Sequence, residues 1–150
     1  MPTMPFAPLG KYAFIKANWH NEIVHQALTG FMDIIAEQQI EVFDVPGAFE
    51  LPLIARDLAR TGKYDTVVAA ALVVDGGIYR HEFVAQAVVT GLMQAGMDSD
   101  IPVLSVSLTP HQFQETEHHI NIYKDHFKLK GREAAQAALA IANVRSGLAG

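Results

Sequence analysis

The amino-acid sequence predicts a single α/β domain in which a four-stranded parallel sheet lies between two layers of helices. Short apolar segments typical of strands alternate with segments of helical periodicity along the chain. About ten or more residues separate consecutive strands, which is enough for a parallel crossover and too long for a tight hairpin. Residues 67–74 are apolar without alternation, as expected for a strand covered on both faces.

The first half of the chain contains three predicted strands and two predicted helices. Residues 12–17 read as a strand, and apolar side chains then recur at helical spacing over residues 23–38. Residues 40–45 form the second predicted strand, and residues 48–59 the second helix. The almost wholly apolar segment 66–74 is the third strand.

The second half contains a long predicted helix over residues 79–97 and a fourth strand over residues 102–108. Two helical stretches follow, at residues 110–123 and 129–144, and residues 120–130 are expected to connect them as a loop. The resulting order, βαβαβαβαα, predicts a flavodoxin-like three-layer αβα fold. Right-handed crossovers place helices on both faces of its sheet.

Composition restricts the classes of function. The chain has 150 residues and a mass of 16.4 kDa, which fits one domain spanning residues 1–150. A net charge of -5 argues against a nucleic-acid partner. The absence of cysteine excludes disulfides and a thiol nucleophile. No segment resembles a signal peptide or a membrane span, so the expected location is the cytoplasm, with no membrane partner.

Residues whose side chains or backbone could bind a ligand or catalyse a reaction are concentrated directly after the predicted strands. Ligands of open parallel sheets bind outside the carboxyl ends of the strands. The segments found there are Asn18-Trp19-His20, residues 46–50, residues 75–81 and Thr109-Pro110-His111. The opposite strand ends carry ordinary polar loops, so we expect the functional site at the carboxyl edge.

Residues 45–50, Val-Pro-Gly-Ala-Phe-Glu, turn from a strand directly into a helix. Such a turn offers backbone N–H donors, an aromatic face and the Glu50 carboxylate to a hydroxylated or heterocyclic ligand. The alternative is a plain turn in which Glu50 complements the helix dipole. Trp19, the only tryptophan, suits a stacking role, the alternative being packing against its own loop.

Residues 75–81 suit an anion and a proton transfer. Asp75-Gly76-Gly77 before a helix can form a nest of N–H groups for phosphate, although a Gly-Gly pair by itself more often marks a plain turn. Arg80 can hold an anion but cannot act as a base, whereas His81 titrates near neutrality. The histidines later in the chain lack metal-ligand spacing, and we predict no metal site.

These segments together resemble the 6,7-dimethyl-8-ribityllumazine synthase family. The resemblance rests on residues 45–50, on Trp19 and on the segment from Gly77 to Val84. Pro102-Val103 and Lys130-Gly131 also fit, so it covers nearly the whole chain. It implies condensation of 5-amino-6-(ribitylamino)pyrimidinedione with 3,4-dihydroxy-2-butanone 4-phosphate. The products are the lumazine, phosphate and water, and no cofactor is required.

The resemblance also implies residue roles. Trp19 would lie under the pyrimidine ring, Glu50 would bind the ribityl hydroxyls, and Lys130 would reach a ring carbonyl from an adjacent subunit. The implied substrate-binding residues are Trp19, His20, Gly47, Ala48, Phe49, Glu50, Val73, Val74, Gly76, Gly77, Ser105, His119 and Lys130. The implied catalytic residues are His81 and Arg80.

Several positions depart from the family pattern. Arg80 occupies the place of the family's catalytic histidine, and His81 follows one residue later. Ile78 stands where a phosphate-binding threonine is common, and His119 where an arginine binds phosphate. Ser105 replaces an aromatic residue that a neighbouring subunit often contributes.

Two other functions are compatible with the fold. A non-catalytic flavin- or lumazine-binding protein would keep Trp19 and Glu50, and the altered histidine position is its only support. A phosphoacceptor signalling domain would use Asp75, but it needs an acidic pair after the first strand, and Asn18-Trp19-His20 supplies none.

The predicted last helix is apolar nearly all round over residues 134–144, so we expect a subunit interface to cover part of it. The resemblance implies pentamers with active sites between neighbours. Icosahedral members have a Gly-Lys-Ala-Gly type kink before the last helix. The expected loop 120–130 lacks it and is longer, which predicts a homopentamer or a homodecamer of two pentamers rather than a capsid.

Overall fold

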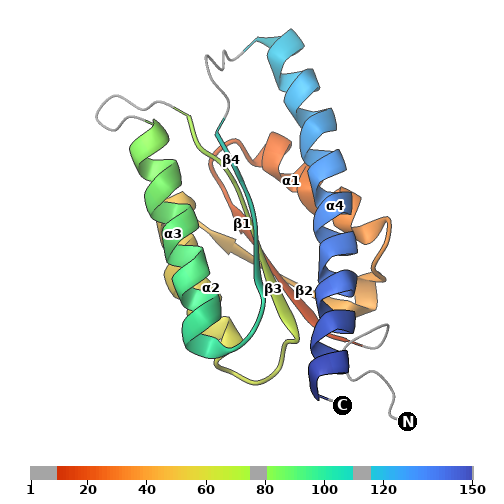
Figure 1. Ribbon diagram of the computed structural model, residues 1–150. Helices are drawn as coiled ribbons and strands as arrows, with labels where there is room; N and C mark the ends of the chain where they lie inside the picture. The colour runs from red at the N-terminus through yellow and green to blue at the C-terminus, as the bar shows by residue number, and fades with distance from the viewer. Residues whose placement is uncertain (1–9, 75–80, 110–115, 150) are drawn as a thin grey trace.

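The computed structural model of the chain describes residues 10–74, 81–109 and 116–149 (Figure 1). Four parallel strands form one sheet in the order β2-β1-β3-β4. They are β1 (Tyr12–Ala17), β2 (Ile40–Val45), β3 (Thr66–Leu72) and β4 (Val103–Leu108). The sheet confirms the predicted fold class, and β2 and β4 are its edges.

Helices cover both faces of the sheet (Figure 1). α1 (Asn21–Met32) and α4 (Glu117–Ala149) pack on one face, and α2 (Leu51–Ala59) and α3 (His81–Ser99) pack on the other. Among the described residues, no helix has both the length and the hydropathy needed to cross a membrane.

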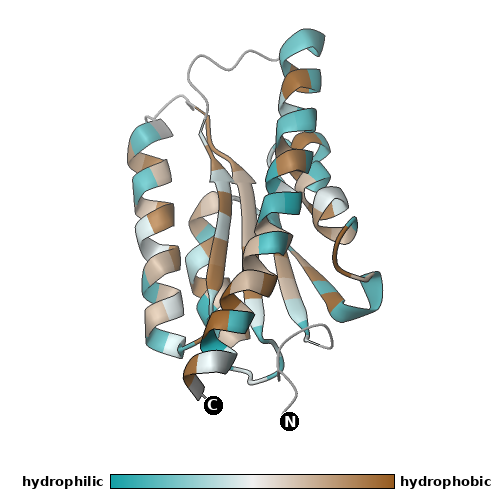
Figure 2. Cartoon of the chain, turned by 45° about the vertical axis from the view of Figure 1, so that its right-hand side comes forward, coloured by the Kyte–Doolittle hydropathy of each residue, from teal (hydrophilic) through white to brown (hydrophobic). Residues whose placement is uncertain are grey.

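Alternation along β1 divides the hydrophobic core into two halves. Tyr12 and Phe14 point toward α1 and α4, whereas Ala13 and Ile15 point toward α2 and α3. Every residue of β3 is buried, which confirms the prediction of a strand covered on both faces. Hydrophobic residues accordingly occupy much of the length of the strands, and the helices carry both hydrophobic and hydrophilic residues (Figure 2).

Two glycines allow α1 and α4 to approach closely. A Cβ atom built on Gly131 would lie 1.9 Å from the carbonyl oxygen of Ala27, and one on Gly30 would lie 2.0 Å from that of Lys128. These distances are far below van der Waals contact, so each helix presents its glycine to the backbone of the other. The crossing fixes α4 across the sheet face that α1 also covers.

Two elements differ from the sequence prediction. α1 ends at Met32 rather than near Gln38, and a 3₁₀ turn at Glu37–Gln39 leads into β2. The expected loop 120–130 is instead part of one helix, α4, which also contains the predicted helix 129–144 and residues 117–123 of the preceding one; residues 110–115 of that predicted helix lie outside the described residues. The loop prediction was wrong because residues 120–130 contain no proline or glycine and continue a buried stripe. That stripe consists of Ile120, Tyr123, Phe127, Ala134, Ala135 and Ala138.

Candidate active site

A groove of about 380 Å³ opens at the carboxyl ends of β1, β2 and β3, beside the first turn of α3. Its position agrees with the expected ligand site of a parallel sheet. Its lining is mainly apolar and aromatic and contains a single carboxylate. The lining residues are Trp19, Pro46, Gly47, Ala48, Phe49, Glu50, Leu72, Val73, Val74 and Val84.

The segment after β2 orients Glu50 through its own backbone. Residues Ala48–Glu50 form a 3₁₀ turn that runs directly into α2. The Gly47 N–H donates to Glu50 Oε1 at 2.8 Å, and the Glu50 N–H donates to the Gly47 carbonyl at 3.3 Å. One carboxylate oxygen is therefore held by the turn, which leaves Oε2 as the acceptor for a ligand hydroxyl.

Trp19 projects from the turn between β1 and α1. Its side chain is 68% exposed and meets the ring of His20 in the same turn edge-on, so most of the indole surface is open to a ligand. The Asn18 N–H donates to the Val45 carbonyl at 2.9 Å and attaches this turn to the end of β2. Phe49, 53% exposed, gives the same groove a second aromatic face.

His20 adopts a left-handed backbone conformation with φ of 56°. Non-glycine residues reach this region at a modest energetic cost, and such strain is concentrated at functional sites. The His20 ring lies edge-on to Trp19 with 6.5 Å between ring centroids. His20 is therefore next to the groove, although it does not line it.

The end of β3 uses much of its backbone hydrogen bonding within the fold. The Val73 N–H donates to the Leu108 carbonyl at 2.8 Å, and Thr109 Oγ1 donates to the Val73 carbonyl at 2.7 Å. The Val73 N–H is therefore engaged by the end of β4.

Three lining residues were not among the sequence-based candidates: Pro46, Leu72 and Val84. A signal for Val84 was present. Val88, Leu92 and Ala95 are buried against the sheet at helical spacing, and Val84 lies one turn earlier on the same stripe. The stripe extends beyond the core at the carboxyl edge, so its first member contributes to the groove.

Ser105 and Lys130 lie elsewhere. They share a second hollow of about 320 Å³ between β4 and α4, and Lys130 Nζ pairs with Glu133 Oε1 at 3.0 Å. His119 lies in the first turn of α4, with its ring edge-on to Tyr123. Within one chain the structure does not bring these predicted site residues together with Trp19.

The remaining candidates fall outside the described residues. Gly76, Gly77 and Arg80 belong to the segment 75–80, and although His81 begins α3, its side chain is likewise not described. In the described ranges no group of three or more histidine, aspartate or glutamate side chains is placed to hold a metal ion.

The described part of the groove can hold a planar ring against an aromatic face. The turn-held carboxylate can accept hydrogen bonds from a hydroxylated tail. Such a groove provides binding and orientation, and the groups with the best chemistry for proton transfer and anion binding lie in the adjoining segment 75–81.

Comparison with known proteins gives one consistent family. The family model of 6,7-dimethyl-8-ribityllumazine synthase matches residues 10–146. A 6,7-dimethyl-8-ribityllumazine synthase of Rhodococcus erythropolis is 54% identical over 132 residues, which cover 85% of each chain. A 6,7-dimethyl-8-ribityllumazine synthase 2 of Pseudomonas syringae pv. tomato is 53% identical over 134 residues, 86% of this chain and 79% of the relative. A protein of the same name from Bradyrhizobium diazoefficiens is 47% identical over 135 residues, 88% and 82% of the two chains.

Proposed function

This chain belongs to the 6,7-dimethyl-8-ribityllumazine synthase family, and we propose that its Trp19 groove is the part of the active site that holds the ribityl-pyrimidine. The enzyme condenses 5-amino-6-(ribitylamino)pyrimidinedione with 3,4-dihydroxy-2-butanone 4-phosphate in riboflavin biosynthesis. Phosphate and water leave as the lumazine forms. One observation carries the proposal: a single groove combines the exposed indole of Trp19 with the turn-held carboxylate of Glu50.

The division of labour follows from the chemistry of the groove. The indole of Trp19 stacks on the pyrimidine ring, and Glu50 Oε2 accepts hydrogen bonds from ribityl hydroxyls. The Val74 backbone contacts the ring edge. The phosphate of the second substrate then belongs beside Gly76, Gly77 and Arg80, with His81 as the proton-transfer group. These roles agree with the residue types, since glycine N–H groups and guanidinium bind anions and imidazole titrates near neutrality.

Catalysis of this reaction depends strongly on orientation. The amine of the pyrimidine attacks the butanone carbonyl to form an imine with loss of one water, and phosphate is eliminated. The ribitylamino nitrogen then attacks the remaining carbonyl, and the ring closes with loss of a second water. Holding both substrates in place at an effective molarity on the order of 10⁵ M contributes about 7 kcal/mol. General acid and base assistance adds a smaller factor of about 10²- to 10⁴-fold. The Trp19 groove suits this need for orientation, because the turn at residues 47–50 holds its Glu50 carboxylate in place.

The second hollow, with Ser105 and Lys130, is proposed to complete the site of a neighbouring subunit. Both residues lie along the β4 edge, whereas the Trp19 groove is bounded by β1, β2, β3 and α3. If two chains associate so that the β4 edge of one faces the groove of the other, Lys130 reaches the ring from across the interface. This arrangement supports the predicted homo-oligomer with active sites between subunits.

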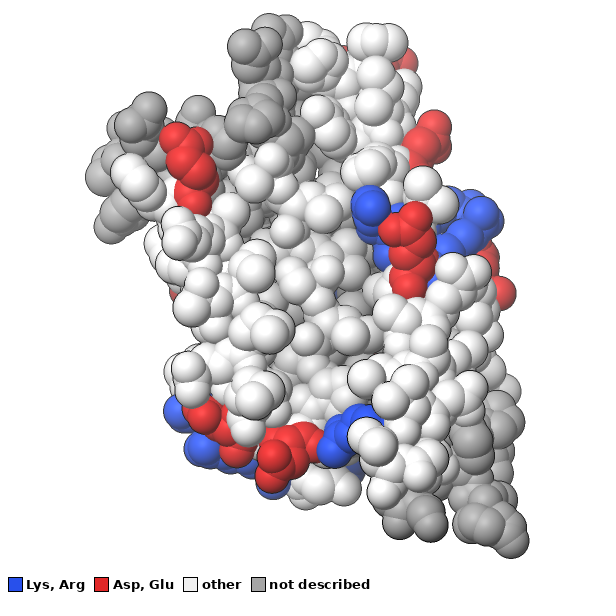
Figure 3. Space-filling model, viewed as in Figure 1, with Lys and Arg blue, Asp and Glu red and all other residues white. Residues whose placement is uncertain are grey.

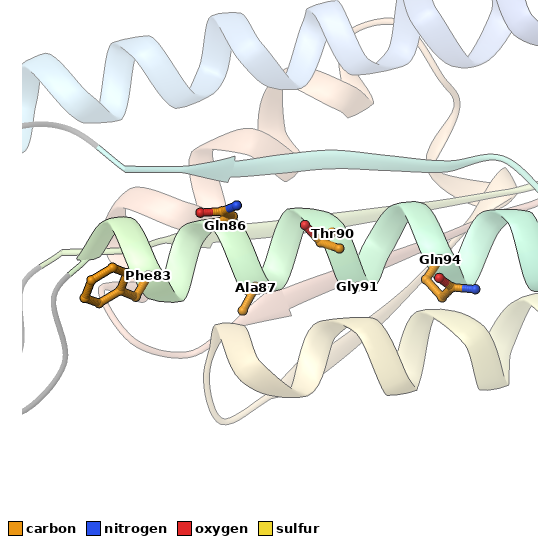
Figure 4. A pocket seen from close by; sticks show the side chains of 6 residues that line it. All are labelled: Phe83, Gln86, Ala87, Thr90, Gly91 and Gln94. Carbon is orange, nitrogen blue, oxygen red and sulfur yellow. The ribbon is translucent and has the colours of Figure 1, made fainter.

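The surface around β4 supports such an association. Figure 3 shows that the centre of the face between α3 and α4 carries no charged side chains. Met93 and Met97 of α3 line a hollow beside β4 and are 63% and 74% exposed. Further along α3, a hollow of about 540 Å³ is lined by the residues labelled in Figure 4, from Phe83 to Gln94. It contains no ionisable group, which fits an interface better than a catalytic site.

We propose a pentamer or a pair of pentamers as the assembly. A long loop at residues 120–130 cannot obstruct capsid packing, because that segment is part of α4. The sequence nevertheless lacks the Gly-Lys-Ala-Gly kink of the icosahedral type. The non-catalytic binding function has no support beyond the altered histidine position.

Subunit complementation tests both the groove and its partner. Trp19→Ala and Lys130→Ala should each lower lumazine formation severely. Co-expression of the two variants should restore activity to at most about one quarter of the wild-type level, because in a randomly mixed symmetric oligomer about one site in four has two intact halves. The product is fluorescent and phosphate is released, so both can be followed together.

The matched control combines Trp19→Ala with Glu50→Gln. Both substitutions lie in the same groove, so every groove in the mixture carries a defect and activity should not recover. Recovery in this control, or no recovery with Lys130→Ala, would rule out a site shared in the proposed way.

A further inference from the structure

We propose that Lys16, a buried lysine of β1 with no assigned role, positions Trp19 for ligand binding by joining β1, β2 and the start of α1 beneath the turn at residues 18–20. The inference rests on the proposed role of the Trp19 groove. Lys16 is a positioning residue, because it does not line the groove.

Lys16 is 7% exposed, and its ammonium group has two partners from different elements. Lys16 Nζ lies 2.8 Å from Asp44 Oδ1, on the β2 residue paired with it across the sheet, and donates to Asn21 Oδ1 at 3.1 Å. Asn21 is the first residue of α1. One side chain therefore fastens three elements at the carboxyl edge of the sheet.

A lysine at this position breaks the pattern of its own strand. Tyr12 and Phe14 occupy the same face of β1 and belong to the core with α1 and α4. An apolar side chain would continue this core, whereas a buried ammonium group is costly unless it is paired. A local exception to the core pattern at the edge of a site is where a functional constraint is expected.

The two partners of Lys16 flank the turn that carries Trp19. Asp44 precedes Val45, whose carbonyl accepts from the Asn18 N–H, and Asn21 donates its own N–H to the Asn18 carbonyl at 3.1 Å. Between these attachments, His20 is held at φ of 56°. A turn that contains a strained residue relaxes unless the surrounding structure over-determines it. Lys16 constrains the turn by holding Asp44 on one side of it and Asn21 on the other.

The Lys16 side chain does not reach the ligand site itself. Ala13, Ile15 and Ala17 face α2 and α3, so Lys16, between Ile15 and Ala17, faces the α1 and α4 side. The groove lies across the strand ends, because Val84 of its lining packs on the α2 and α3 side and Leu72 on the α1 and α4 side. Lys16 is not among the lining residues, so it influences the ligand only through the turn it supports.

The experiment uses Lys16→Met, which keeps the length of the stem and removes the charge, and Asn21→Ala, which removes only the link to α1. Both should raise KM for the ribityl-pyrimidine, by about tenfold for Lys16→Met, with kcat changed less than about twofold. KM for the butanone phosphate should stay near the wild-type value. The steady-state anisotropy of Trp19, the only tryptophan, should fall in both variants.

Asp33→Asn is the matched control. It removes an ion pair of the same length, Arg132 Nε to Asp33 Oδ2 at 2.8 Å, which joins α4 to the end of α1 away from the groove. It should leave KM and anisotropy unchanged. If Asp33→Asn changes KM and anisotropy as much as Lys16→Met does, the effect is a general loosening of the fold and the inference is overturned. Wild-type KM and anisotropy in both Lys16→Met and Asn21→Ala would overturn it as well.

Trp19→Ala separates this inference from the proposed function. If Trp19→Ala leaves KM for the ribityl-pyrimidine unchanged, the groove assignment itself fails and the role of Lys16 falls with it. If Trp19→Ala raises KM but Lys16→Met does not, the groove stands and only the positioning role is overturned.

Discussion

Glu50 shows how a single residue can be oriented without help from distant side chains. Its carboxylate accepts from the Gly47 N–H three residues earlier, so the turn that places Glu50 in the groove also fixes its rotamer. Glu50 is exposed, so ligand hydroxyls can replace the water that hydrates its carboxylate. This arrangement spares the ligand the entropic cost of ordering a flexible acceptor.

Glu50→Gln should weaken binding of ribityl-bearing ligands by about 1.5–3 kcal/mol, because a charge-assisted acceptor is replaced by a neutral one. Calorimetric titration with a ribityl-pyrimidine measures this directly. Glu22→Gln, on an exposed position of α1 outside the groove, serves as the control. Equal affinity of Glu50→Gln and wild type would refute the acceptor role.

Trp19 emission should be quenched when lumazine or riboflavin binds, because a stacked ring would lie at van der Waals distance from the only indole. The groove position and exposure of Trp19 make it accessible to such a ligand. Fluorescence titration, with binding measured independently by calorimetry, tests the role. Bound ligand with unaltered emission would contradict stacking.

Tyr64 gives the fold a pH dependence at alkaline pH. Its burial, together with the hydrogen bond that it donates to Glu41, raises the pKa of its hydroxyl from 10.0 to about 12. The folded state thus holds the proton more tightly than the unfolded state. The associated stability is complete below about pH 10 and is lost as pH rises toward about 12.

Tyr64→Phe should therefore lose less stability than wild type when urea denaturation is compared at about pH 9 and about pH 11.5. The variant keeps a ring to pack edge-on against Phe43. Parallel losses in the two proteins would show that Tyr64 does not titrate in the way described.

At the scale of elements, the crossing of α1 and α4 depends on glycine. Gly131 lies against the backbone of α1. A Cβ atom added at Gly147 of the same helix would have no heavy atom of the described residues within 4 Å outside its own helical turn. The two positions therefore separate the steric demand of the crossing from the helix propensity of glycine. α4 also carries Lys130, so the crossing determines where the second hollow lies.

Gly131→Ala should destabilise the fold by about 1–3 kcal/mol or more, because the two backbones must separate. Gly147→Ala should be neutral or stabilising by up to about 1 kcal/mol, because alanine favours a helix. Urea denaturation of both variants provides the comparison. A neutral Gly131→Ala would mean that the helices cross less closely than described.

At the scale of the whole molecule, the apolar face around β4 is the strongest argument for association. It combines the exposed side of α3 with an edge strand, and an uncovered sheet edge favours pairing or coverage by another chain. The hollow with Ser105 and Lys130 adjoins it along β4, so assembly and completion of the active site are expected together.

Light scattering at neutral pH should give about 5 or 10 times the 16.4 kDa chain mass, as closed symmetry requires. Met93→Lys should reduce this mass and lumazine formation together while far-UV circular dichroism is retained. Val42→Lys, on the opposite edge strand, is the control. A wild-type monomer or a 60-subunit shell would contradict the proposed assembly.

Most of the elements, the parallel sheet and the carboxyl edge as the place of the groove could be predicted from the sequence. Helical and strand periodicities are local, and connection rules convert their order into a topology. The segments at residues 45–50 and 77–84 were sufficient to indicate the family. The prediction of a loop at residues 120–130 was wrong, because Ile120, Tyr123 and Phe127 recur at helical spacing and belong to the buried side of α4.

The partners of individual side chains and backbone groups, in contrast, follow from the three-dimensional packing. It separated Ser105 and Lys130 from the Trp19 groove, engaged the Val73 N–H with Leu108, and paired buried Lys16 with Asp44 and Asn21. Periodicity states which face a side chain occupies, but hydrogen bonds between strands depend on register and on contacts between distant segments. Those contacts are set by packing of the whole chain, and no local pattern specifies them.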